Sequence, residues 1–430
     1  MQEKRSGRVW MGLFVALVVM GVAMDARADG AVPVRGEQTE TGWRPTRGGE
    51  PYFVKGAGGG VRMDLIRDTG GNGFRTWGIH PTTGERLDEA HSHGLQVTLG
   101  FWLPHKGAKK DFADPEFRKT QLDALRAEVL KYRDHPALLI WAIGNESEQG
   151  QNTPEYWSLV NELALLVKEL DPNHPTMTVT AEMGGNFDKM LAEHAPAIDI
   201  WGINSYAGLF TLRQRLDNRG WSKPILICEF GPKGHWEVPR TSWRAPIEQS
   251  STEKAGQYAY LYENVILADP RCVGSYVFLW GQKHEATETW FSMFSRGRPT
   301  ELIDTMHRMW TGEWPADLAP KIIGITSDLA MQEVDAGQMF DVKLNAFDPE
   351  GKLLKIEWEV RSSVRREGMG AGEVDPNPME HTALVEGEGA NVKVKTPSIP
   401  GNYRLFVFVS DPGGKVATHN VPFRVREPAE

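Results

Sequence analysis

Short apolar segments alternate with longer amphipathic segments from about residue 52 to residue 310 of the chain. Most of the apolar segments carry almost no charge, which is typical of strands that helices cover on both faces of a parallel sheet. Eight such strands are expected, at residues 52–57, 73–78, 95–101, 138–144, 176–181, 198–204, 224–229 and 273–280.

The segments between these strands carry the start signals of helices. Asp114 and Thr153 each stand directly before a proline, the arrangement of an N-cap followed by the first helical residue. Ser250 and Glu253 form the pattern of a capping box, and Thr300 is expected to cap the last helix of the series. Helices therefore fill most of the gaps between the expected strands.

Eight repeats of strand and helix over about 265 residues have the size and rhythm of an α/β fold, the (β/α)8 TIM barrel. A doubly wound sheet is the alternative, and it usually carries a glycine-rich turn that binds a nucleotide. The best candidate for that turn, GAGGGV at residues 56–61, has Val61 where the last glycine of the fingerprint belongs. The preferred prediction is therefore a barrel with an N-terminal lead-in over residues 29–316.

The pattern changes after Trp314 and Pro315. Apolar and polar residues then alternate with a period of two, broken by turns at residues 348–351 and 411–414. This alternation predicts a small all-β sandwich over residues 317–430. The segment resembles the immunoglobulin-like PKD modules that follow many exported carbohydrate enzymes. Because it carries no converging pair of carboxylates, we expect the chemistry not to depend on it.

The first residues have the pattern of a secretory signal. Basic side chains precede an apolar stretch at residues 10–24, and Ala26 and Ala28 are the small residues of a cleavage site. We therefore expect residues 1–28 to be a signal peptide and the mature protein to be exported, to a periplasm or outside the cell. An uncleaved anchor is the alternative, but the apolar stretch is short for a membrane span, so no stable span is expected after processing.

Composition narrows the function further. The net charge is −9, so we expect no nucleic acid partner, because binding nucleic acid requires a basic face. Fifteen tryptophans are many, and indole rings often form flat platforms for sugars.

The two cysteines, Cys228 and Cys272, fall at opposite ends of neighbouring strands, which predicts two buried thiols. HEATE at residues 284–288 lacks the second histidine of a zinc helix, so neither metal nor cofactor is expected. Oligomeric state is left open.

The candidate chemistry lies at the carboxyl ends of the expected strands, where the working residues of such barrels are placed. Glu146 ends the fourth strand and Glu229 the seventh, on nearly opposite sides of a barrel. Cleavage of a glycosidic bond with retention needs two carboxyl groups about 5–5.5 Å apart. The expected substrate-binding residues come from the other strand ends and their loops, namely Arg75, Trp102, His105, Asn145, Asn204, Tyr206, Trp236, Trp280 and Gln282.

Some roles can be assigned and others stay open at this point. Arg75 is expected to keep Glu229 ionised through its charge, and Asn145 to bind a sugar 2-hydroxyl. Glu148 is a competing acid, but its side chain is expected to leave the barrel axis. Glu182 is expected at the polar rim, and Trp77 and Trp102 are open between core and sugar subsite.

IWAIGNE at residues 140–146 and ILICEFG at residues 225–231 together resemble the acid/base and nucleophile motifs of the glycoside hydrolase clan that acts from strands four and seven. That clan includes families 2 and 5. The lead-in at residues 42–59 is similar to that of family 2 barrels, and the whole stretch of about 42–315 also resembles fungal β-1,3-glucanosyltransferases.

The resemblance implies that Glu146 is the acid/base and Glu229 the nucleophile. It also implies that Arg75 and Tyr206 support them, with Asn145, and that Trp280 is the platform under the reacting sugar. No jelly-roll domain precedes the barrel, so the galactosidase and glucuronidase specificities of family 2 are not carried over.

These observations predict an exported, retaining β-glycoside hydrolase or transglycosylase that acts on a β-glucan-like poly- or oligosaccharide. The alternative from another class is a non-catalytic protein that keeps the barrel to bind polysaccharide. The presence of both carboxylates favours the enzyme.

Overall fold

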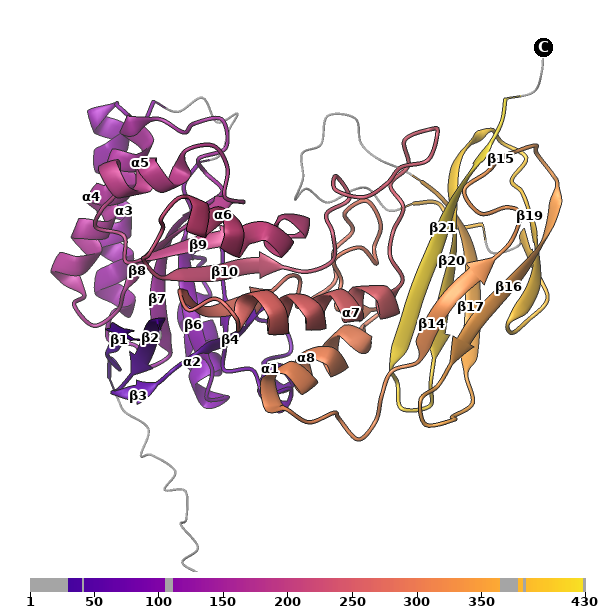
Figure 1. Ribbon diagram of the computed structural model, residues 1–430, viewed down its shortest axis with the longest axis horizontal. Helices are drawn as coiled ribbons and strands as arrows, with labels where there is room; N and C mark the ends of the chain where they lie inside the picture. The colour runs from indigo at the N-terminus through magenta and orange to yellow at the C-terminus, as the bar shows by residue number, and fades with distance from the viewer. Residues whose placement is uncertain (1–29, 41, 105–110, 364–377, 382–383, 428–430) are drawn as a thin grey trace, which may run out of the picture.

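The computed structural model describes residues 30–40, 42–104, 111–363, 378–381 and 384–427. Figure 1 shows a helix-wrapped barrel followed along the chain by a β-sandwich, with helices α7 and α8 on the side of the barrel that faces the sandwich. The predicted signal peptide, residues 1–28, lies outside the described residues. Within the described ranges, no helix is both long and apolar enough to cross a membrane.

Eight parallel strands of the described chain close into a barrel, in the order β10-β11-β4-β5-β6-β7-β8-β9. All eight expected strands are found and the barrel prediction is confirmed; the doubly wound alternative is wrong because β11 pairs with β4 and leaves no edge. Their bounds are β4 Val54–Gly58, β5 Gly73–Arg75, β6 Gln96–Phe101, β7 Leu138–Asn145, β8 Thr176–Ala181, β9 Ile200–Asn204, β10 Ile225–Phe230 and β11 Cys272–Val277.

Helices surround this barrel and begin where the sequence predicts. Asp114 accepts a hydrogen bond from Glu116 N over 3.0 Å at the start of α3, and Ser250 and Glu253 complete a capping box at α7. Thr300 stands at the N-cap of α8, but its hydroxyl donates to Met293 O instead of capping the helix. The helices are α1 Met63–Asp68, α2 Thr83–Ser92, α3 Pro115–Tyr132, α4 Pro154–Leu170, α5 Phe187–His194, α6 Leu212–Asn218, α7 Ser251–Leu261 and α8 Glu301–Thr311.

The lead-in forms a small antiparallel sheet at the amino ends of the barrel strands. It consists of β1 (Val34–Thr39), β2 (Gly42–Arg47) and β3 (Glu50–Pro51), and Val34 N donates to Asn173 O in the loop before β8. Trp43 from β2 packs against the apolar cluster at this end of the barrel. The lead-in therefore closes the end of the barrel opposite the candidate chemistry.

The C-terminal part is an all-β sandwich of two four-stranded sheets within the described residues, as the alternating pattern predicts. One sheet has the order β14-β16-β19-β18 and the other β15-β21-β20-β17. Trp358 lies in the core between them, with Leu405 and Phe423. The bounds are β14 Lys321–Thr326, β15 Glu333–Val334, β16 Met339–Phe347, β17 Lys355–Ser362, β18 Val385–Glu386, β19 Asn391–Lys395, β20 Gly401–Ser410 and β21 Val416–Val425.

Both cysteines are free and buried, as predicted. Burial raises the pKa of the Cys228 thiol and that of the Cys272 thiol, each to about 12. Each thiol is therefore protonated at neutral pH and acts as a small apolar side chain in the barrel wall.

Candidate active site

Glu229 lies near the end of β10 with hydrogen-bond donors around its carboxylate. The Tyr206 hydroxyl donates to Oε2 over 2.8 Å, and the Trp77 indole Nε1 donates to Oε1 over 2.8 Å. Arg75 adds its charge, with Nη1 3.6 Å from Oε1. These three groups, from β5 and from the loops after β5 and β9, favour the ionised carboxylate because each stabilises negative charge. Trp77 therefore belongs to the site.

Arg75 is a positioning residue beneath the site, because it is only 1% exposed. Its Nη2 donates to Asn145 Oδ1 over 2.7 Å, and its Nη1 donates to Asn204 Oδ1 and to Cys228 O. Its guanidinium thus links residues of three barrel strands, β7, β9 and β10. Arg75 and Asn204 thus support neighbouring side chains from buried positions, and their contact with the substrate stays a prediction.

Glu146 is the first residue after β7, and its backbone is left-handed, with φ of 54°. Asn204 Nδ2 donates to Glu146 Oε1 over 2.7 Å, and Gln149 Nε2 donates to Oε2 over 2.8 Å. Left-handed backbone costs free energy for any residue but glycine and occurs often at functional positions. The turn after Gly144 thus aims the Glu146 side chain along the barrel mouth, where Asn204 holds it.

The surroundings of Glu146 favour its protonated form. Burial, and next the charge of Glu229, raise the pKa of Glu146 to about 7. The two carboxyl groups are therefore within electrostatic range of each other. Burial, followed by the charges of Glu229 and Glu146, raises the pKa of Tyr206 well above its ordinary value, so this phenol keeps the proton that it donates. Near neutral pH the site can hold one protonated and one ionised carboxyl group.

Aromatic side chains from two loops stand exposed at the mouth. Trp102, directly after β6, is 48% exposed, and Trp236, in the loop after β10, is 44% exposed. The Trp236 ring meets the Tyr206 ring edge to face, with centroids 5.6 Å apart. Gln282 is also exposed, and its Oε1 accepts from Arg296 N. Trp102 and Trp236 are thus exposed aromatic side chains on the loops that follow β6 and β10. His105 lies outside the described residues.

The expectation that Trp280 is the sugar platform is wrong. Its side chain is 1% exposed, stacks on Trp310 at 6.0 Å and meets Phe294 at its edge. An indole packed on both sides by core aromatics offers no face to a sugar. The chain turns directly after β11, which places Trp280 in the wall between the barrel and α8 instead of over the mouth.

Two further carboxylates near the strand ends behave as the sequence predicts. Glu148 is fully buried and turned toward β8, where its Oε1 accepts from Ala181 N over 2.8 Å. Burial raises the pKa of Glu148 to about 8, so this carboxyl is mostly protonated at neutral pH. Glu182, after β8, pairs with Arg215 over 2.7 Å at the partly exposed rim. Neither carboxylate contacts Glu229.

A third acidic side chain near the catalytic pair comes from the segment after β11. Glu285 is buried, with Oε1 3.2 Å from His235 Nε2 and Oε2 2.8 Å from Lys283 Nζ. Its charge contributes to raising the pKa of both Glu146 and Tyr206. Sequence reasoning considered this segment only as a metal motif and missed its place beside the site. Its position after the eighth strand was the one available signal.

With this geometry in view, comparison with known proteins gives a consistent result. Residues 86–242 match the model of the glycosyl hydrolases family 2, TIM barrel domain. The middle of this barrel is thus similar to the barrel domain of that family. The matched range contains β6 to β10 and both Glu146 and Glu229.

Curated proteins that are similar to this chain are named as glycoside hydrolases. A probable mannan endo-1,4-beta-mannosidase F of Aspergillus flavus is 25% identical over 214 residues, covering 39% of this chain and 46% of that protein. The beta-glucuronidase of Rattus norvegicus is 26% identical over 200 residues, covering 41% of this chain and 29% of that protein. The chain thus spans less than half the length of these relatives.

Solved structures share the fold. The beta-glucuronidase of Ruminococcus gnavus superposes with a TM-score of 0.52 and 16% identity, covering 66% of this chain and 53% of that one. At that level of identity the likeness is one of fold alone. The functional argument therefore depends on the residues of the site.

Proposed function

We propose that this protein is a retaining β-glycoside hydrolase or transglycosylase in which Glu146 is the acid/base and Glu229 the nucleophile. One observation carries the proposal. Two carboxyl groups at the ends of β7 and β10 have opposite surroundings: burial and a neighbouring charge favour a proton on Glu146, while three donors surround Glu229. This division of states is what double displacement at a sugar requires.

In the first step, a Glu229 oxygen forms a bond to the anomeric carbon as the bond from that carbon to the leaving oxygen breaks. Glu146 gives its proton to the leaving oxygen, so the departing sugar leaves as a neutral alcohol. Asn145 Oδ1 accepts hydrogen bonds from Arg75 and Asn204. Its Nδ2 has no hydrogen-bond partner among the described residues, and we assign it to the sugar 2-hydroxyl.

In the second step, Glu146 is ionised and takes a proton from a water molecule or from a sugar hydroxyl. That oxygen attacks the anomeric carbon from the opposite face, and the bond to Glu229 breaks. Water gives hydrolysis, and a sugar hydroxyl gives transfer. Two inversions leave the anomeric configuration of the product the same as that of the substrate.

The proposed substrate is a β-glucan-like poly- or oligosaccharide. The exposed side chains of Trp102 and Trp236, in the loops after β6 and β10, support this proposal as surfaces on which sugar rings can stack. A β-mannan is the second candidate, because the matching fungal relatives are named mannan endo-1,4-beta-mannosidases. Export, supported by the signal pattern of residues 1–28, would bring the enzyme to such polymers. We also propose that the sandwich is an immunoglobulin-like module.

The test is product analysis with a panel of β-glucans, β-mannans and aryl β-glycosides, followed by NMR of the anomer released first. We expect turnover of at least one β-linked substrate with release of the β-anomer. The matched control is Glu182→Gln, which changes a rim carboxylate outside the pair and should keep wild-type turnover. Release of the α-anomer would exclude retention, and binding of polymer without turnover of any substrate would establish the non-catalytic alternative.

A further inference from the structure

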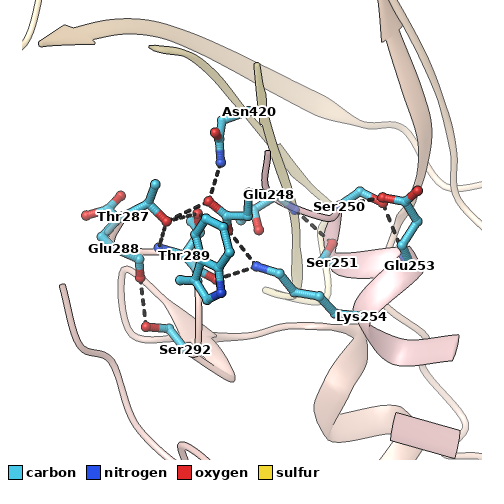
Figure 2. Close-up of polar contacts among 12 residues, drawn as sticks. Glu248, Ser250, Ser251, Glu253, Lys254, Thr287, Glu288, Thr289, Ser292 and Asn420 are labelled. Atoms are coloured by element: carbon cyan, nitrogen blue, oxygen red, sulfur yellow. Dashed lines mark hydrogen bonds and ion pairs between the residues drawn. The ribbon is translucent and has the colours of Figure 1, made fainter. Parts of the chain in front are cut away.

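Glu248 is a buried carboxylate shared by three separate parts of the chain (Figure 2). Its Oε1 accepts from Lys254 Nζ of α7 over 2.6 Å and from Thr289 Oγ1 over 2.8 Å. Its Oε2 accepts from Thr287 Oγ1 over 2.6 Å and from Asn420 Nδ2, in β21 of the sandwich, over 2.6 Å. Four donors thus satisfy one charge that is removed from water.

A second contact from the sandwich reaches the same part of the barrel. Arg361 in β17 has Nη1 3.0 Å from Glu288 Oε1, and its side chain is nearly buried. The guanidinium also lies over the rings of Phe406 and Phe408 in β20. Arg361 therefore contacts Glu288 directly, and Asn420 reaches Thr287 and Thr289 through Glu248. These residues belong to one short stretch, residues 283–292, which we name the bridging segment.

Two other residues of the bridging segment, Glu285 and Phe291, lie beside the candidate active site. Glu285 contacts His235 and Lys283, as described above, and the Phe291 ring lies 5.3 Å from the ring of Tyr206. Phe291 also packs on Phe278, whose ring meets Trp77. One segment thus contacts Tyr206, which donates to Glu229, and carries Glu285, whose charge contributes to raising the pKa of Glu146.

The bridging segment has little regular structure that would hold it by itself. It contains a backbone bridge between Glu285 and Thr287, and the Ser292 hydroxyl supports its ends. A stretch without a backbone ladder takes its conformation from its side-chain partners. Here those partners are Glu248 and Lys254 on the barrel and Arg361 on the sandwich, and Asn420 acts through Glu248.

We propose, on the basis of the glycosidase function above, that the sandwich is part of the active-site architecture and that Asn420 and Arg361 are positioning residues for the bridging segment. They keep Glu285 and Phe291 in place against Glu146 and Tyr206. The sandwich thereby affects the reaction without contacting the substrate. Sugar binding by the sandwich is not required for this role.

The test uses full-length variants Asn420→Leu and Arg361→Met, which remove the polar group and retain most of the volume. The matched control is Asn391→Leu, which changes an exposed asparagine of β19, a strand on the far side of the sandwich from the barrel (Figure 1). Hydrogen exchange of peptides covering residues 283–292 should rise in both variants and stay unchanged in the control. Arg361→Lys, which keeps the charge, should restore most of the protection.

The kinetic measurement separates positioning from simple loss of stability. We expect kcat on an aryl glycoside to fall about 10- to 100-fold with a smaller change in KM, since displaced catalytic groups act on the transition state. The alkaline limb of the pH profile of kcat/KM should also move to lower pH. A displaced Glu285 would raise the pKa of Glu146 less, because its negative charge would lie farther away. The charged and titratable groups that face Glu146 are Glu229, Arg75, Tyr206, Glu148 and Glu285.

Wild-type exchange, kcat and pH profile in folded Asn420→Leu and Arg361→Met proteins would overturn this role for the sandwich. If either variant fails to fold, Glu288→Gln replaces it. This variant removes the ion pair with Arg361 by changing its partly exposed partner, and the same exchange and kinetic measurements apply. A wild-type protein with no turnover would instead contradict the proposed function, while hydrogen exchange would still decide whether the sandwich holds the segment.

Discussion

The Tyr206 hydroxyl and the Glu229 carboxylate lie 2.8 Å apart, with the phenol as donor. Both are buried, and the contact joins the loop after β9 to the end of β10. Burial and the charges of the two catalytic carboxylates hold the pKa of Tyr206 far above neutral, so the phenol does not lose this proton during the reaction.

Tyr206→Phe should therefore lower kcat without unfolding the protein. A hydrogen bond to a charged group contributes about 1.5–3 kcal/mol, which corresponds to a loss of about 10- to 100-fold. The measurement is kcat and KM on an aryl β-glycoside, with the exposed Tyr260→Phe as control. An unchanged kcat would mean that Tyr206 does not orient the nucleophile.

Glu146→Ala should affect substrates according to their leaving group. Loss of a general acid costs about 10²–10⁴-fold for a sugar leaving group, whereas a dinitrophenol needs no proton in the first step. Added azide should then attack the intermediate and give the β-glycosyl azide. An equal loss on both classes of substrate, with no azide product, would remove Glu146 from the acid role.

Glu229→Ala should abolish both steps, because no covalent intermediate can form without the nucleophile. Azide should restore turnover only by direct attack from the opposite face, and this gives the α-glycosyl azide. In the wild type, a mechanism-based fluorosugar should label the peptide that contains Glu229. Labelling of the Glu146 peptide instead would reverse the two assignments.

The pH profile should follow the Glu146 carboxyl. Because burial and the Glu229 charge raise its pKa to about 7, the acid is lost as the pH rises past that value and kcat/KM should decline. Glu285→Gln removes a neighbouring negative charge, so the alkaline limb should move to lower pH. If the alkaline limb of Glu285→Gln lies at the same pH as that of the wild type, Glu285 does not raise the pKa of Glu146.

Glu148 should make folding stability depend on pH. Burial raises its pKa from 4.5 to about 8 in the folded protein, so the fold favours the protonated form. The resulting stabilisation is complete below about pH 4.5 and is lost as the pH rises through 8. The melting temperature of Glu148→Gln should therefore fall less between pH 6 and pH 9 than that of the wild type. Glu169→Gln, on the exposed side of α4, is the control, and parallel curves for wild type and Glu148→Gln would exclude this contribution.

Much of the barrel could be predicted because its signals are local. A strand buried on both faces must be apolar along its length, and a helix start needs a cap such as Asp114 or Ser250, so each element is written in neighbouring residues. Once eight such strands are counted, the geometry of a barrel places the ends of the fourth and seventh strands at one mouth. The positions of Glu146 and Glu229 follow from the sequence in this way.

Other features were decided only by the tertiary structure, because they depend on which distant residues share a space. Trp77 and Trp280 both follow barrel strands, yet Trp77 donates to Glu229 whereas Trp280 is packed against Trp310 of α8. No nearby residue distinguishes the two indoles. Likewise, Asn420 lies in an ordinary alternating strand, and only the docking of the two domains brings its amide to Glu248. Local pattern determines which element forms, and long-range packing determines which side chains of that element meet the site.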